Sequence, residues 1–279
     1  MRSIFLFCSF FFFSALAYGE PSAKSGRVLV SIAPYKFLVE QISGDTCEVS
    51  VIVSKNFDPH TYEPSPSQLE KFLKADLWFR MGEPFEAICK KVLSCKQVDL
   101  TKNITMISLS GKGCSHRFTS YDTHTWLSPK NLQIQVKAIV NALVTQFPQH
   151  THLYQRNGEK LLSTLDSLDK EISQITSNAR QRNILVSHGA FAYFCRDYDF
   201  SQHTVERSHH LDPSPKDIVN MAQTIRNHHI SSIILLRHSG KRSTNLLAER
   251  FGLQTVTIDP YEEHVIDNLK TIATTFAGL

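Results

Sequence analysis

The chain has 279 residues, of which 42% are hydrophobic and 20% charged, and a formal net charge of +4 at pH 7. This length suffices for one large domain or for two domains of about 100 to 150 residues each. The charge is mild, and the lysines and arginines are scattered without a basic run interleaved with aromatic residues. We therefore predict no nucleic-acid partner.

The N-terminus has the pattern of a secretory signal peptide. Arg2 gives a basic start, an apolar run follows from Ile4 to Phe13, and Ala15-Leu16-Ala17 offers a cleavage site. The run is too short for a usual membrane-spanning helix, although an uncleaved anchor is the alternative. We predict a signal peptide over residues 1–17, no transmembrane segment in the mature chain, and a periplasmic location.

Cysteine usage does not indicate a disulfide framework. The predicted mature chain keeps an odd number of cysteines, and no Cys-x-x-Cys spacing occurs, which argues against a thiolate zinc site. An oxidising compartment would permit a bridge between Cys89 and Cys95, but closeness in sequence leaves this pairing open.

Both halves of the mature chain alternate strands with helices. In the first half, strands are predicted at 27–32, 47–54 and 77–81, with helices at 35–43 and from Ser65-Pro66 through Lys74. In the second half, strands are predicted at 183–187, 204–206, 232–236 and 254–258, with helices at 190–198, 215–228, 242–251 and 262–276. Each half is therefore a small α/β unit.

A helical region separates the two units. From Ser128-Pro129 onward, strand signals disappear, and apolar residues recur at helical spacing, with a break near Phe147-Pro148. The helix after this break would be about 45 Å long, which suggests a connector, although core packing or a dimer seam would give the same stripe. We predict two α/β lobes with mainly parallel sheets, at 25–128 and 181–279, joined by a helical region at 129–180 that contains one long helix. We expect a monomer.

A short pattern, Asp-x-His-Thr-aromatic, occurs twice. It reads Asp58-Pro59-His60-Thr61-Tyr62 and then Asp122-Thr123-His124-Thr125-Trp126. Two histidines in matched settings suggest two ligands of one metal ion.

Two further candidates follow predicted strands of the second half. His188 comes directly after the strand ending at residue 187, and Asp259 after the strand ending at residue 258. Ligand sites in open α/β sheets lie beyond the carboxyl ends of strands, so both side chains should project into a cleft between the halves. Three imidazoles and one carboxylate match the ligand preferences of zinc, and four protein ligands favour holding an ion over using it in catalysis.

The segments around these residues resemble the zinc and manganese solute-binding proteins of ABC transporters. Residues 58–66 resemble the first ligand motif of that family, 124–131 the second, 186–194 the third and 257–260 the fourth, and 213–217 match a further recurrent segment. The resemblance implies two α/β lobes joined by one long helix, with the metal between them. It also implies His60, His124, His188 and Asp259 as ligands, and an ABC permease with its cytoplasmic ATPase as partners.

The cargo metal is less determined than the site. Residues 111–121 contain His116 but lack the long His-rich and acid-rich loop of many zinc-specific members, whereas His188 stands where manganese-type members often carry glutamate. We predict Zn²⁺ as bound cargo, with Mn²⁺ or Fe²⁺ as alternatives. Two positions also depart from the family pattern. Thr123 stands where the family usually has proline, and Gly189 where it often has aspartate or proline.

An enzyme is the rival hypothesis, because zinc with an open coordination position is a catalytic arrangement. A secreted zinc-dependent hydrolase would need further groups, and the chain has no His-Glu-x-x-His motif, no Gly-x-Ser-x-Gly motif and no evident general base beyond Glu63. We therefore predict no catalytic residues and no enzymatic activity. Surface adhesion, a third possibility, has no residue-level support.

Overall fold

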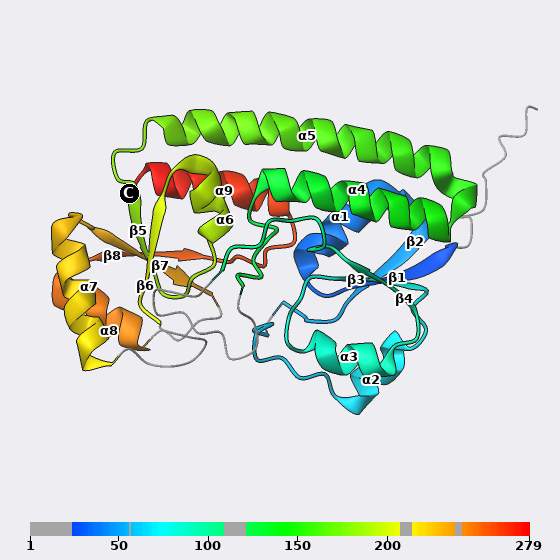
Figure 1. The fold of residues 1–279 in the computed structure, drawn as a ribbon, viewed down its shortest axis with the longest axis horizontal. Coiled ribbons are helices and arrows are strands. Elements are labelled where there is room, and N and C mark those ends of the chain that lie inside the picture. Colours follow the sequence, from blue (N-terminus) through cyan, green and yellow to red (C-terminus); the bar gives the residue numbers. More distant parts are fainter. Residues whose placement is uncertain (1–23, 56, 109–120, 207–213, 238–241) are drawn as a thin grey trace, which may run out of the picture.

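The computed structural model describes residues 24–55, 57–108, 121–206, 214–237 and 242–279. The predicted signal peptide, His116 and Cys114 lie outside these ranges. Two lobes, each built on a parallel sheet of four strands, lie side by side under a shared layer of helices (Figure 1). Among the described helices, none is long and apolar enough to cross a membrane.

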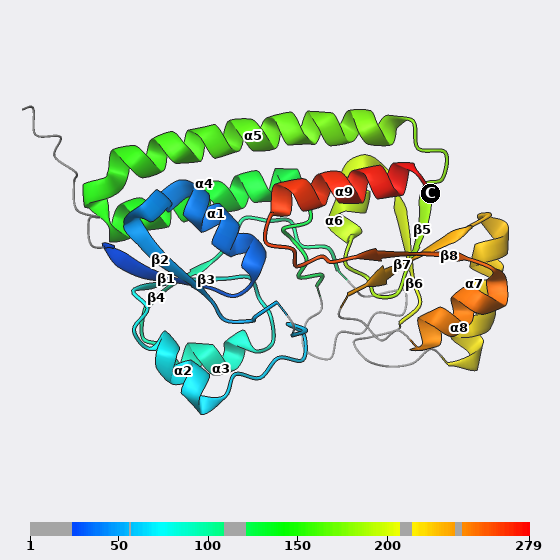
Figure 2. The same ribbon diagram turned by 180° about the vertical axis from the view of Figure 1, so that it is seen from behind.

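The N-terminal lobe contains a parallel sheet in the order β2-β1-β3-β4. Alternation along β1 sends Val28 and Val30 to the core under α1 and Leu29 to a second core under α2 and α3. Helices therefore cover both faces, as a parallel sheet requires (Figure 2). The elements are β1 (Gly26–Val30), α1 (Ala33–Ser43), β2 (Cys47–Val51), α2 (Pro66–Phe72), β3 (Leu77–Arg80), α3 (Glu86–Val92) and β4 (Lys96–Asp99).

The C-terminal lobe repeats this plan, with a parallel sheet in the order β6-β5-β7-β8. Ile184 and Val186 of β5 face the core under α6 and α9, whereas Leu185 faces α7 and α8. Its elements are β5 (Asn183–Val186), α6 (Ala192–Tyr198), β6 (Ser201–Thr204), α7 (Pro215–Asn227), β7 (Ser232–Leu236), α8 (Arg242–Phe251), β8 (Gln254–Ile258) and α9 (Val265–Ala277).

Two consecutive helices connect the lobes, α4 (Pro129–Gln146) and α5 (Thr151–Ser177). The predicted break at Phe147-Pro148 is present as a short 3-10 turn, because proline cannot continue the hydrogen-bond ladder of the preceding helix. The buried stripe Leu161, Leu165, Leu168 and Ile172 of α5 faces the common core. Helix α5 packs against α4, α1 and α9, so it contacts both lobes and is the predicted connector.

The structure differs from the sequence-based prediction mainly at the sheet edges. Helix α3 and edge strand β4 were not predicted, because both are short. Edge strand β6 covers Ser201–Thr204, not 204–206, because its polar sequence carries little alternation. Cys89 and Cys95 are both free thiols.

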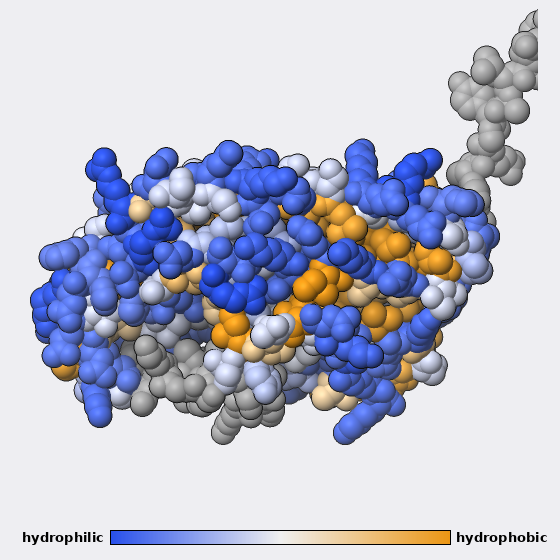
Figure 3. All heavy atoms as spheres, turned by 45° about the horizontal axis from the view of Figure 1, so that its top comes forward, coloured by the Kyte–Doolittle hydropathy of each residue, from blue (hydrophilic) through white to orange (hydrophobic). Residues whose placement is uncertain are grey.

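The surface differs between the two lobes. On the face drawn in Figure 3, hydrophobic side chains gather over the half that holds the N-terminal lobe, whereas the other half is mostly hydrophilic. The largest exposed fraction among the apolar side chains of the described residues is 59%, at Leu246 on α8. Leu246 lines a pocket together with Ile218 and Met221 of α7.

Candidate metal centre

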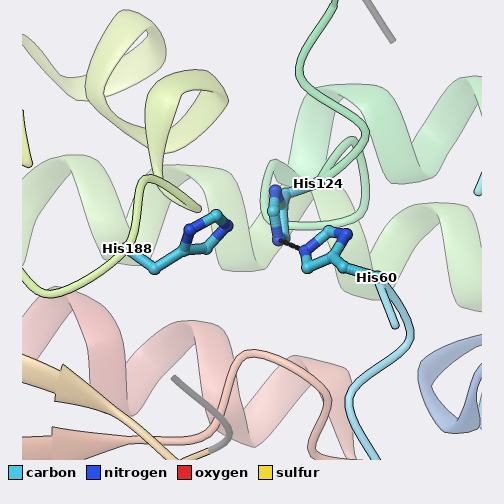
Figure 4. A group of neighbouring side chains, drawn as sticks. All are labelled: His60, His124 and His188. Carbon is cyan, nitrogen blue, oxygen red and sulfur yellow. Dashed lines mark hydrogen bonds between the residues drawn. The ribbon is translucent and has the colours of Figure 1, made fainter. Parts of the chain in front are cut away.

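Three histidines from three separate segments meet between the lobes. His60 lies in the loop after β2, His124 in the loop before α4 and His188 just after β5, and their rings point toward one another (Figure 4). One nitrogen of each ring lies within 4.8 Å of those of the other two, and within the described ranges no other histidine, cysteine or acid belongs to a group of this kind. The structure thus brings together the three predicted imidazole ligands.

The spacing within this group suits a zinc ion. The Nε2 atoms of His60 and His124 are 3.3 Å apart. Four ligands at about 2.0–2.1 Å from a tetrahedral zinc ion stand about 3.3–3.4 Å from one another. This pair therefore already has the separation that the ion requires, and His188 supplies a third nitrogen.

The repeated Asp-x-His pattern forms the same local structure twice. The backbone N–H of His60 donates to Oδ1 of Asp58 at 2.9 Å, and that of His124 donates to Oδ1 of Asp122 at 2.8 Å. Aspartate is suited to this turn because its short side chain reaches the backbone two residues ahead. The motif thus holds each of the two histidines in the same hydrogen-bonded turn.

Each histidine also has a carboxylate near its Nδ1 atom. Nδ1 of His60 lies 2.9 Å from Glu83, Nδ1 of His124 lies 2.8 Å from Asp122, and Nδ1 of His188 lies 3.5 Å from Glu206. Because an ionised carboxylate only accepts, the two short contacts place the hydrogen on Nδ1, so that Nε2 of each neutral ring carries a lone pair. Carboxylates in this position are typical of zinc sites.

The electrostatics of the His60–Glu83 pair favour the charged forms of both groups. Burial alone disfavours the imidazolium, but Glu83, Asp58 and Asp122 outweigh it and raise the pKa of His60. Burial likewise opposes ionisation of Glu83, but contacts with His60 and Thr123 lower its pKa overall. A metal ion bound at His60 would therefore compete with a proton.

Glu83 also links the two motifs. Its second oxygen accepts a hydrogen bond of 2.6 Å from the hydroxyl of Thr123, the middle residue of the second motif. Proline, which the related pattern usually has at this position, has no hydroxyl to make this bond. The departure at Thr123 thus has a structural reason.

In the C-terminal lobe, polar residues follow all four strands at one edge of the sheet. In sheet order these are Glu206 after β6, His188 after β5, Arg237 after β7 and Asp259 after β8. A Cβ atom at Gly189 would lie 3.0 Å from the side chain of Thr204, so glycine lets the His188 loop pass close to β6. The strand-end argument thus placed His188 and Asp259 at the correct edge.

Asp259 lies at this edge but outside the group of three histidines. Its side chain is nearly buried, its Oδ1 accepts the backbone N–H of Tyr261 at 2.9 Å, and its Oδ2 lies 3.1 Å from Nε of Arg237. Glu63, the other carboxylate considered from the sequence, is exposed to solvent and is not in the group either.

Sequence reasoning did not find Tyr261. Its hydroxyl lies 3.0 Å from Nε2 of His60 and 3.3 Å from Nε2 of His124. The signal was present, because Asp259-Pro260-Tyr261 repeats Asp58-Pro59-His60 with tyrosine in place of histidine. Burial and the surrounding carboxylates raise the pKa of this phenol well above its ordinary value, so the hydroxyl keeps its hydrogen.

Comparisons with known proteins find relatives that match nearly the whole chain. A protein of Chlamydia trachomatis that is named for metal binding is 54% identical over 263 residues, which cover 94% of this chain and 95% of the relative. A crystal structure of ZnuA superposes with a TM-score of 0.84 at 29% identity, covering 91% of this chain and 98% of that one. A zinc-bound deletion mutant of ZnuA gives a TM-score of 0.83, also at 29% identity, over 91% and 97%.

The family itself is shown by the match of a whole-family sequence model. The model described as zinc-uptake complex component A, periplasmic, covers residues 28–277. Members of this family are components of a transport system and not enzymes, in agreement with the prediction of no enzymatic activity. The chain belongs to the ZnuA family of periplasmic zinc-uptake components, within the metal-binding solute-binding proteins of ABC transporters.

Proposed function

We propose that this protein binds one divalent transition-metal ion, preferably zinc, between its lobes and delivers it to the permease of an ABC transporter. The observation that carries the proposal is the buried group of His60, His124 and His188, with a carboxylate near each Nδ1 atom. In neutral His60 and His124, Nε2 then carries a lone pair, which is the form that zinc binds. The similarity to a zinc-bound ZnuA structure supports zinc as the cargo.

The family supports delivery to a permease, and the family and the N-terminal sequence together support export to the periplasm. The proposed signal peptide at residues 1–17 would take the chain across the inner membrane. The ATPase that powers uptake would act through the permease and would not touch this protein. The organisation into lobes at 25–128 and 181–279, with the helical region 129–180 between them, is part of the proposal.

Asp259 remains our predicted fourth ligand. To reach an ion beside the histidines, its carboxylate would exchange the contact with Arg237 for the metal. An Asp259→Asn variant tests this step, because loss of a ligand should weaken zinc binding far more than the loss of a contact with one partly exposed arginine.

The test of the proposed site is a double replacement, His60→Ala with His188→Ala. We expect stoichiometric zinc binding to disappear, because only one imidazole of the group remains. His203→Ala is the matched control, since His203 bonds Asn183 and stacks on His228 outside the group. Metal content would be measured after purification from the periplasm, followed by competition between zinc, manganese and iron. Unchanged metal content in the double variant would refute the assignment.

A further inference from the structure

We propose that the Tyr261 hydroxyl acts as an internal lock on the metal centre: it donates its single hydrogen to Nε2 of His60 when no ion is bound and so weakens metal affinity. This inference rests on the proposed function and adds a residue that sets how tightly the ion is held. Two observations support it: the short distances from the Tyr261 hydroxyl oxygen to the two imidazoles, and a local turn that occurs three times.

The hydroxyl meets the two atoms that a metal ion needs. Its oxygen stands 3.0 Å from Nε2 of His60 and 3.3 Å from Nε2 of His124, and the two nitrogens are 3.3 Å apart. In the neutral rings, hydrogen on both Nδ1 atoms, facing Glu83 and Asp122, makes both Nε2 atoms acceptors. The phenol is the donor, and its single hydrogen goes to the nearer atom, Nε2 of His60, whose lone pair is then not available to an ion.

The turn that carries Tyr261 is the third copy of the turns that carry His60 and His124. In all three, the backbone N–H of the aromatic residue donates to Oδ1 of the aspartate two positions earlier, at 2.9, 2.8 and 2.9 Å respectively. The side-chain amide of Asn268 further fixes this turn by donating to the carbonyl of Asp259 at 2.8 Å. Tyr261 is therefore presented to the centre in the same way as the two ligands.

Neighbouring groups hold the phenol ring in place. The ring of Trp126 lies 5.2 Å from that of Tyr261 between centroids, and the indole N–H donates to the carbonyl of Pro260 at 2.8 Å. Because Tyr261 belongs to the C-terminal lobe and the two histidines to the N-terminal lobe, the lock also joins the lobes. When an ion binds both Nε2 atoms, the hydroxyl must give up these contacts.

The test is Tyr261→Phe, which removes the hydroxyl and keeps the ring. Without the competing hydrogen bond, zinc should bind about 2- to 10-fold more tightly, as measured by competition with a chromophoric chelator. The metal-free variant should also melt about 2–4 °C lower, because the buried imidazoles lose a donor.

Tyr154→Phe is the matched control. Tyr154 is fully buried, and its hydroxyl bonds Thr46 away from the histidines, so its removal should lower the melting temperature without changing zinc affinity. Unchanged zinc affinity in Tyr261→Phe would overturn the inference, and weaker binding would overturn it by identifying the hydroxyl as a ligand. Wild-type protein that binds no zinc would instead refute the proposed function.

Discussion

At the scale of single residues, the proposed metal centre is built with groups that are not among its predicted ligands. Glu83 contacts Nδ1 of His60 at 2.9 Å and the hydroxyl of Thr123 at 2.6 Å, and its side chain is fully buried. It fixes the orientation of one imidazole and of the loop that carries His124. A carboxylate in this position normally increases metal affinity by orienting the imidazole and making it more basic.

Glu83→Gln tests this role. We expect zinc affinity to fall about 10- to 100-fold, because the neutral amide no longer polarises His60, although it can still bond Thr123. Glu63→Gln is the control, since this exposed glutamate lies three residues from His60 and outside the group of histidines. Chelator competition measures both variants, and equal affinities would show that Glu83 does not support the site.

Some residues of the site can be recognised from the sequence, and others cannot. His60 and His124 stand out because a local turn repeats, and His188 because it follows an apolar strand. Glu83 gives no local signal, since its partners lie 23 and 40 positions away. Tyr261 was missed because tyrosine is not a usual zinc ligand, although its turn copies that of His60.

At the scale of elements, the long helix was the most predictable part of the fold and the sheet edges the least. The stripe of Leu161, Leu165 and Leu168 has a strong helical period, and proline marks where the preceding helix ends. Strand β4 is only Lys96–Asp99, and most of its side chains are partly exposed, so little apolar patterning records it. Pairing with β3, not local sequence, determines this strand.

The contact between α4 and α5 requires a glycine. A Cβ atom at Gly158 would lie 2.5 Å from Cγ2 of Val140, and valine has little rotamer freedom in a helix. Alanine normally stabilises a helix by about 1 kcal/mol relative to glycine. Here the expected overpacking cost of about 1–3 kcal/mol opposes this gain.

We therefore predict that the effect of Gly158→Ala on the free energy of unfolding changes sign with the residue at position 140. In the wild-type background it should lower the free energy of unfolding by about 1 kcal/mol, whereas in a Val140→Ala background it should raise it by up to about 1 kcal/mol. Urea unfolding of the wild type, the two single variants and the double variant measures this double-mutant cycle. Equal effects in both backgrounds would show that the two helices do not touch at this point.

At the scale of the whole molecule, we expect pH to link folding to the proposed metal binding through the buried His60–Glu83 pair. Asp58, Asp122, His124 and Tyr261 also surround His60. Because its pKa is raised, the contribution of His60 to stability is fully present below its unfolded value of about 6.5 and is lost as pH rises through the folded value. The contribution of Glu83, whose pKa is lowered, is present above about 4.3 and is lost as pH falls through its folded value.

The contribution of this pair to the stability of the metal-free protein should therefore be largest between about pH 4.3 and 6.5. Zinc, by contrast, needs His60 in its neutral form. We predict that the rise in melting temperature caused by saturating zinc shrinks as pH falls from about 8 to 6, and that the loss begins above the ordinary pKa of histidine of about 6.5. The melting temperature of the metal-free protein should not fall over the same range. Scanning calorimetry with and without zinc measures both quantities, and a zinc effect that stays constant over this range would show that no proton competes with the ion at His60.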